Sequence, residues 1–170
     1  MERILLMIYS DIYQKLTRSE QFKAWSPEHS DFYLTHFYTT LNNKYQITTP
    51  WELGFYSKSQ DKIATFIVDK KITLKPEEEV FKKKGEVNPL DLQTIKIDHQ
   101  EALKLFQEQK EKHHSPEQLL TGFLILQNLN HQIIWNISFA TRSMHILNFK
   151  LDAQTKELIS SQLINFIERK

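Results

Sequence analysis

Two segments of the chain share one alternating pattern, and this pattern constrains the fold more than any other feature of the sequence. The segments read WELGFYSKS over 51–59 and WNISFATRS over 135–143. Strict alternation of apolar and polar residues predicts β-strands with one face on a core and the other toward water. Trp, Phe and the final Ser recur at matching positions. The two segments therefore predict strands of one architecture that occurs twice along the chain.

The elements predicted around each segment follow the same order. The first half predicts a helix over 2–23, a Ser-Pro-Glu turn, and strands over 32–41, 51–57 and 63–68. The second half predicts a helix, a second Ser-Pro-Glu turn, a strand, the second Trp strand and a strand over 147–151. Asp98 is the expected N-cap of the second helix, because Glu101 follows three residues later as in a capping box.

This order predicts an α+β fold of two tandem α-β-β-β units, 1–88 and 89–170, with helices packed on curved antiparallel sheet. The charged stretch 70–88 is interpreted as a linker or a short solvated helix. A C-terminal helix is expected from apolar residues at helical spacing, which are Leu158, Ile159, Leu163, Phe166 and Ile167. Chance similarity between two amphipathic strands is the alternative to duplication. The sequence leaves open whether the two units share one sheet.

Charge and composition narrow the classes of function. Lys and Arg number 22 and Asp and Glu 21, so the charge balance gives no reason to expect nucleic acid or an anionic membrane as partner. The absence of cysteine excludes disulfides, thiol catalysis and Cys-based zinc sites. The apolar run 4–9 is too short for a signal-peptide core or a membrane span. We expect a cytoplasmic protein as the chain is written, or an extracytoplasmic one if a leader or anchor was removed.

No combination of residues predicts catalysis, a cofactor or a metal site. The seven histidines include no His-x-x-x-His or His-x-His spacing, which a zinc site favours. The three glycines build neither a phosphate loop nor a Gly-x-Ser-x-Gly nucleophile motif. Trp51 and Trp135 are interpreted as core anchors, because each shares a strand face with aliphatic and Phe side chains. The sequence predicts a protein that is not an enzyme.

Three short motifs in the second half resemble a PepSY-like domain. They are IDHQEAL over 97–103 at the start of a helix, Trp135-x-Ile137-x-Phe139 on a strand, and LDAQT over 151–155 at the end of the last strand. The resemblance covers about residues 94–160, and it extends to 1–75 only through the internal repeat. Lys156 stands where the family usually has glycine, which puts the construction of that turn in doubt. In the first half Lys70-Lys71 replaces the signature after Val68-Asp69.

The PepSY resemblance implies a cystatin-like arrangement, in which a helix packs on a curved antiparallel sheet. Proteins of this family are mostly non-enzymatic and occur in protease propeptides and envelope proteins, where they are thought to bind or restrain partner proteins. The family pattern has no catalytic residues to carry over. Its usual setting outside the cytoplasm conflicts with the absence of a leader in this chain.

Two functions are expected from these observations. The first is a non-enzymatic protein-binding or regulatory module, whose contact surface would include Tyr56, Lys58 and Arg142 together with exposed edge strands. Its partner is a protein of unknown identity or a second copy of the chain. The alternative is a small-molecule cup, carrier or enzyme, formed by a helix on an aromatic-rich sheet. The residues expected to line that cup are Tyr33, His36, Tyr38 and Tyr56.

Overall fold

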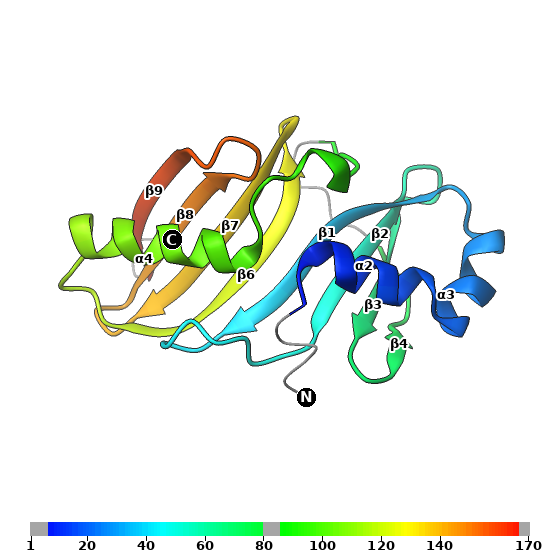
Figure 1. The fold of residues 1–170 in the computed structure, drawn as a ribbon, viewed down its shortest axis with the longest axis horizontal. Helices are drawn as coiled ribbons and strands as arrows, with labels where there is room; N and C mark the ends of the chain where they lie inside the picture. Colours follow the sequence, from blue (N-terminus) through cyan, green and yellow to red (C-terminus); the bar gives the residue numbers. More distant parts are fainter. Residues whose placement is uncertain (1–6, 80–85, 167–170) are drawn as a thin grey trace.

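A single antiparallel sheet of nine strands runs through the computed structural model, which describes residues 7–79 and 86–166 (Figure 1). The strand order is β4-β3-β2-β1-β6-β7-β8-β9, and β5 pairs with β3 beside β4. The first five strands are β1 (Phe32–Leu41), β2 (Trp51–Ser57), β3 (Lys62–Val68), β4 (Ile72–Leu74) and β5 (Glu78–Glu79). The others are β6 (Leu119–Leu129), β7 (Gln132–Thr141), β8 (His145–Asp152) and β9 (Leu158–Asn165). The prediction of an α+β fold with antiparallel strands is confirmed.

Three α-helices and two 3-10 turns are present in the described part of the chain. The α-helices are α2 (Tyr9–Thr17), α3 (Glu20–Trp25) and α4 (His99–His113), and the 3-10 turns are η1 (Ser26–Glu28) and η2 (Leu92–Thr94). The predicted N-cap is confirmed, since the Asp98 carboxylate accepts a hydrogen bond from the Glu101 N–H at 2.9 Å. The helix predicted over 2–23 is divided at Ser19, which has an extended backbone and caps α3. Residues 1–6 of that prediction lie outside the described residues.

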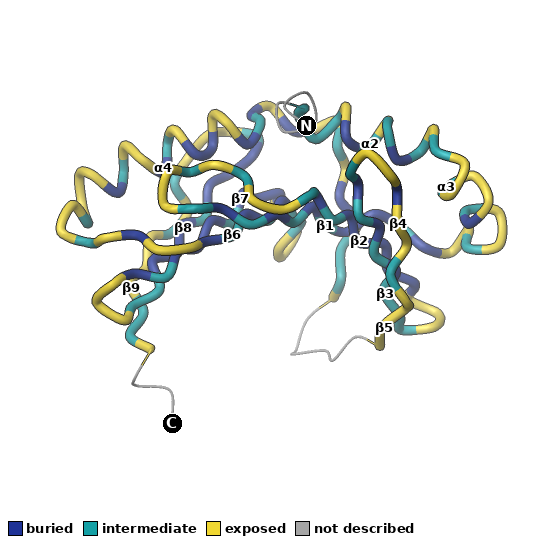
Figure 2. Tube along the Cα trace, turned by 90° about the horizontal axis from the view of Figure 1, so that it is seen from below, coloured by how far each residue is buried: buried dark blue, intermediate teal, exposed yellow. Residues whose placement is uncertain are grey.

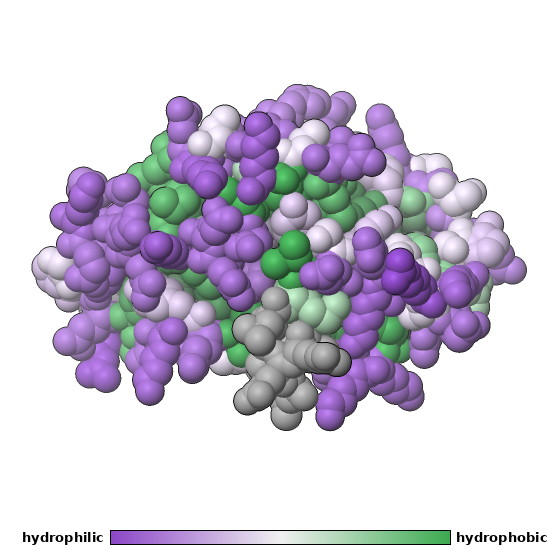
Figure 3. Space-filling view, in the orientation of Figure 1, coloured by the Kyte–Doolittle hydropathy of each residue, from purple (hydrophilic) through white to green (hydrophobic). Residues whose placement is uncertain are grey.

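All three helices lie on one face of the sheet, and the two edges of the sheet bend away from them (Figure 2). The face without helices is therefore concave. Hydrophilic side chains dominate the view onto the helices, and hydrophobic residues are visible in the recesses between them (Figure 3). This distribution is typical of a sheet with one covered and one open face.

Strand alternation decides which residues form the core under the helices. Residues that face one another across antiparallel strands lie on the same side of the sheet. Leu34 lies opposite Phe55 and Phe37 opposite Leu53, and these side chains are buried toward the helices. Trp51 and Trp135 are buried in the same layer, with exposed fractions of 2% and 0%, as expected for core anchors. The Trp135 indole Nε1 donates to the Ile97 carbonyl at 3.0 Å, which fixes the start of α4 on the sheet.

Two predicted elements are wrong in the described residues. The segment expected to form a C-terminal helix is strand β9. Phe166 follows this strand and is the last residue that the structure describes. The helical spacing of the β9 segment is overridden because β8 offers an open row of backbone groups, and a five-residue turn brings the chain back along it. The charged stretch 70–88 contains short strands β4 and β5 instead of a helix. Residues 80–85 of that stretch and the residues after 166 lie outside the described residues.

Candidate functional site

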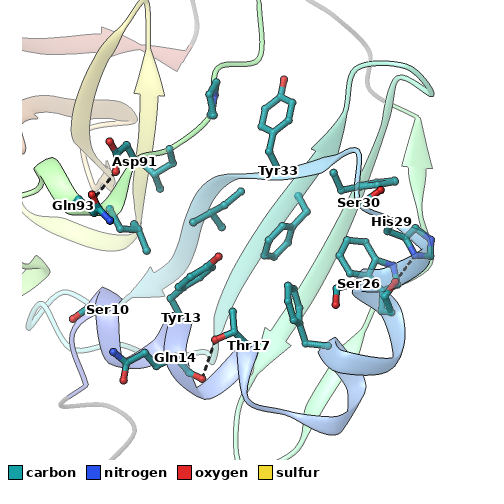
Figure 4. Close-up of a pocket in the computed structure, with 18 residues that line it drawn as sticks. Ser10, Tyr13, Gln14, Thr17, Ser26, His29, Ser30, Tyr33, Asp91 and Gln93 are labelled. Carbon is teal, nitrogen blue, oxygen red and sulfur yellow. Dashed lines mark hydrogen bonds between the residues drawn. The ribbon is translucent and has the colours of Figure 1, made fainter.

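A cleft of about 780 Å³ lies on the helix-covered side of the described structure. Four parts of the fold surround it: helix α2, helix α3 with the turn after it, the start of β1 with β2, and the loop 89–93 (Figure 4). A volume of this size is ordinary for sites that hold small molecules. The cleft is therefore the first candidate for a functional site.

Helix α2 positions one wall of the cleft. Ile12 and Leu16, one turn apart, are fully buried and anchor the helix on the core. Anchoring on this stripe leaves Tyr13, Gln14 and Thr17 to line the cleft. In Figure 4 the Tyr13 ring points from α2 across the cleft toward β1.

The floor of the cleft is aromatic. Phe55 of β2 lies 5.5 Å from Phe22 and 5.7 Å from Trp25, measured between ring centroids. Trp25 also packs edge-on against Phe32 at 5.3 Å and stacks on His29 at 4.5 Å. Such edge-on and stacked pairs hold rings in defined orientations. The floor is thus a rigid apolar surface formed by both a helix and the sheet.

The loop 89–93 forms the remaining wall and is held by hydrogen bonds. The Leu90 N–H donates to the Leu34 carbonyl at 2.9 Å, and the Asn128 side chain donates to the Pro89 carbonyl at 3.0 Å. At the rim, Asp91 accepts a hydrogen bond from the Gln93 N–H at 3.0 Å and so caps η2. These bonds give the cleft a fixed opening.

The outer edge of β9 is a second candidate, because no strand of the described residues pairs with it. Among the residues that the structure describes, β9 pairs only with β8. Its eight residues read LISSQLIN and contain no charge and no proline. The opposite edge of the sheet is formed by β4 and β5, of three and two residues, with Lys75, Pro76 and Glu77 between them. The two edges therefore differ in length and in charge.

A hollow of about 300 Å³ lies on the concave face, lined by residues of β1, β6, β7 and β8 and by Phe166. Phe166, which follows β9, borders it with 53% of its surface exposed. Tyr38 and Phe123 lie deeper in the hollow, with ring centroids 6.1 Å apart. Of these aromatic side chains, Phe166 is the one next to the edge strand β9.

The four residues expected to line a cup do not come together under a helix. Tyr33, His36, Tyr38 and Tyr56 belong to the concave face, because they alternate with Leu34, Phe37 and Phe55 of the core. The described structure divides them among separate recesses, since His36 and Tyr56 border one of about 190 Å³ and Tyr38 borders the hollow near β9. Tyr33 borders the large cleft, but in Figure 4 its side chain points away from it. These four residues lie on the sheet face opposite the helices, so no helix of the described structure covers them (Figure 2). Side chains on neighbouring positions of a strand point to opposite faces, and the cup would need the other set.

The expected partner surface of Tyr56, Lys58 and Arg142 is not one surface. Tyr56 is 1% exposed, and its hydroxyl donates to the Asp61 carboxylate at 2.5 Å. Lys58 and Arg142 are exposed, but they lie in hairpin turns at opposite ends of the sheet. The reason is the antiparallel pairing of β1 with β6, which points the two halves in opposite directions.

His36, which is partly buried, and His99, which is buried, belong to no metal site among the described residues. Burial lowers the pKa of His36, although Glu52 opposes the shift, and burial likewise lowers the pKa of His99 against the influence of Asp98. The described residues contain no cluster of three His, Cys, Asp or Glu side chains that would hold a metal ion. In the same part of the chain, no helix is both long and apolar enough to cross a membrane.

Sequence reasoning missed the cleft. The sequence feature that could have indicated the cleft is Trp25, near the end of the first helical segment. A large aromatic side chain next to a Ser-Pro-Glu turn needs a surface to pack against. The loop residue Asp91 carried no signal, because its place opposite α2 depends on contacts between distant segments. The cleft is therefore a property of the tertiary structure.

Comparison with known proteins gives a fold but no family. No protein-family model matches the chain, and no curated protein matches it. A crystal structure of a putative lipoprotein from Clostridium difficile 630 is similar, with a TM-score of 0.52 and 9% sequence identity. The similarity covers 85% of this chain and 90% of that one. This chain therefore shares the fold of that protein over most of its length.

Proposed function

We propose that the protein is a non-enzymatic module that binds another protein by accepting one of its strands at the free edge of β9. The observation that carries this proposal is the composition of that edge, eight residues without charge or proline. Natural proteins protect exposed edges with charges, prolines and short strands, because an open edge recruits other strands. The edge formed by β4 and β5 has these protective features and β9 lacks them. An unprotected edge is expected where strand addition is the function.

The side chains of β9 favour a partner strand of alternating character. Leu163 lies opposite the buried Leu147 on the helix side of the sheet, and Ile164 lies opposite Ile146 on the concave side. An added strand would place apolar side chains beside both of them and beside Phe166. Backbone hydrogen bonds would then supply affinity, and alternate side chains would supply selectivity.

We infer that the sheet arose by duplication of a PepSY-like unit, as the motifs of the second half suggest. One support is a pair of matching hydrogen-bond clusters at the two hairpin turns. Asp31, before β1, accepts hydrogen bonds from the Ser57 and Ser59 hydroxyls, the latter at 2.8 Å. Glu117, before β6, accepts a hydrogen bond from the Ser143 hydroxyl at 2.6 Å. In both clusters these hydroxyls lower the pKa of the carboxyl group.

We propose an extracytoplasmic setting for this module. The support is the description of the structural neighbour as a putative lipoprotein, together with the usual setting of PepSY-like domains. A module that restrains or presents a partner at the cell envelope agrees with a strand-accepting edge.

The test compares two variants that differ only in which edge they alter. Leu163→Lys places a charge on β9, and Leu74→Lys places the same charge on β4. The two leucines are matched, since they are 39% and 38% exposed and lie opposite buried Leu147 and Phe66. Each protein is incubated with extract of the native host, recovered gently and analysed by native mass spectrometry. We expect a specific partner at defined stoichiometry with the wild type and Leu74→Lys, and its loss with Leu163→Lys.

Hydrogen exchange of the β9 amides gives an independent readout. We expect partner binding to slow exchange in β9 and to leave β4 unchanged, because pairing protects edge amides. A partner retained equally by both variants, or protection at β4 instead, would refute strand addition at β9. A wild-type dimer that Leu163→Lys dissociates would identify the partner as a second copy and refute a heterologous one.

A further inference from the structure

We propose that the cleft between α2, α3 and the loop 89–93 binds a planar aromatic small molecule that is neutral or positively charged and carries a hydrogen-bond acceptor. This inference is separate from the binding of a protein strand, since the cleft lies on the helix side of the other half of the sheet. Three features of the cleft carry it: the apolar floor, the charge of the lining and one buried donor.

The floor selects a flat apolar ligand. Phe22, Phe32 and Phe55 surround Trp25 at centroid distances of 5.3 to 5.8 Å, so the rings support one another in fixed orientations. Phe22 remains half-buried in the absence of a ligand. An aromatic ligand that stacks on this surface would remove apolar area from water.

The lining disfavours an anionic ligand. None of the 18 residues that line the cleft is Lys or Arg. The acidic residue of the lining is Asp91, which lies at the exposed rim. The histidine of the lining is His29, whose Nε2 lies 3.4 Å from a carboxylate oxygen of Glu77. A carboxylate or phosphate would meet no cation in this lining, whereas an amine at the rim would be attracted by Asp91. Because the lining contains an acidic residue and neither Lys nor Arg, we expect a ligand that is neutral or positively charged.

A buried donor in the cleft calls for an acceptor. Trp25 is 9% exposed and lines the cleft, and its indole Nε1–H is buried with no hydrogen-bond partner among the described residues. Buried donors without partners are uncommon, because each costs the desolvation free energy of the group. Trp135 illustrates the usual solution, since its indole N–H donates to the Ile97 carbonyl. A ligand with a carbonyl or ring nitrogen would satisfy Trp25 in the same way once the side chains that cover its indole N–H move aside.

Three naphthalene probes of equal shape test the proposal on the full chain. They are 2-naphthamide, which is neutral, 2-naphthylmethylamine, which is cationic, and 2-naphthoate, which is anionic. Binding is followed in ¹H–¹⁵N correlation spectra through the indole N–H signals of the three tryptophans, assigned with single Trp→Phe variants. Trp51 is the matched control, because its indole N–H is also buried and unpartnered in the described structure but lies outside the cleft.

We expect 2-naphthamide to shift the Trp25 indole signal and to leave the Trp51 and Trp135 signals unchanged. We expect 2-naphthylmethylamine to bind about two- to fivefold more tightly than 2-naphthoate at low salt. Asp91→Asn, which keeps the oxygen that caps η2, should remove this preference. Trp25→Phe, which keeps the ring and loses the N–H, should weaken 2-naphthamide about three- to tenfold.

Three results would overturn the proposal. Tightest binding by 2-naphthoate would contradict the charge assignment, and an unchanged Trp25 signal at saturation would contradict the location. Failure of all three probes to bind at about 1 mM, which bounds the affinity at roughly −4 kcal/mol, would contradict the aromatic class. Each of these results is measured on the wild-type chain, and the Trp→Phe variants serve only to assign the indole signals.

Discussion

At the scale of single residues, the turn after β8 places a lysine in a backbone conformation that favours glycine. The Asp152 carboxylate accepts hydrogen bonds from the Gln154 and Thr155 N–H groups at 2.7 and 2.9 Å. Burial opposes its ionisation, but these bonds and one from Gln132 outweigh burial and lower the pKa of Asp152. Lys156 then adopts a φ of 69°, in the left-handed region that glycine occupies without cost. The turn therefore combines a strained residue with the hydrogen bonds that Asp152 accepts.

We expect Lys156→Gly to raise the free energy of unfolding by about 1 kcal/mol, because a side chain in the left-handed region is strained. The exposed ion pair of Lys156 with Glu101, at 3.3 Å, is lost and contributes little. Urea denaturation measures the change. Lys104→Gly in α4 is the control, since glycine in an exposed helix interior should lower stability by about 1 kcal/mol. Equal destabilisation by both variants would show that Lys156 is not strained.

At the scale of elements, the β1–β2 pair depends on a close approach of one side chain to the backbone of its partner. His36 lies opposite Gly54, and its ring covers the glycine on the concave face. A Cβ atom added to Gly54 would lie 2.1 Å from His36 Cε1. The register of this pair is irregular between Leu34 and His36, which marks a β-bulge. Glycine at 54 thus makes room for a histidine, an arrangement that neither strand requires alone.

We expect Gly54→Ala to lower the free energy of unfolding by about 1 to 3 kcal/mol, because the added methyl group displaces the His36 ring. In a His36→Ala background, the same substitution should cost less than about 1 kcal/mol. A double-mutant cycle in urea measures the coupling. Gly122→Ala is the control, because its added Cβ would lie 2.4 Å from the Ser138 carbonyl oxygen, so removal of His36 should not relieve it. Equal costs of Gly54→Ala in both backgrounds would refute the contact.

At the scale of the whole molecule, the two halves form one body through the centre of the sheet. β1 pairs with β6 from His36 to Leu41, and this pairing joins the strands of the first half to those of the second. Tyr45, in the loop after β1, packs against Phe106 and Phe139 of the second half at 5.9 and 5.6 Å. The core is therefore continuous across the boundary that the sequence suggests.

We expect neither fragment, 1–88 or 89–170, to fold by itself. Separation would expose a full edge of β1 or β6 and would remove the rings that cover Tyr45. Nuclear magnetic resonance spectra of each fragment should lack dispersion, and an equimolar mixture should regain the dispersed spectrum of the intact chain. A dispersed spectrum from either fragment alone would show that it is an independent domain.

Most strands and the helix after Asp98 could be predicted from the sequence, because local patterns determine them. Alternation over 51–57 and 132–141 and the cap at Asp98 act within a few residues. The side of the sheet that the helices cover could not be predicted in this way. An alternating pattern determines which residues share a face, but it does not determine which face the helices cover. The sequence therefore predicts Tyr33 and Tyr56 in a pocket under a helix, whereas both residues lie on the open face of the sheet. The strand β9 was missed for the same kind of reason, because its pairing partner is another segment.

The sequence by itself determined the helix after Asp98, the amphipathic strand pattern and the absence of cysteine chemistry. These properties depend on neighbours along the chain, where steric and hydrogen-bond preferences act directly. Only the tertiary structure decided that β1 and β6 meet at the centre, that β9 is an open edge and that Trp25, Phe55 and Asp91 surround one cleft. Such contacts join residues far apart in sequence, and the free energy that selects them comes from burial shared by the whole sheet.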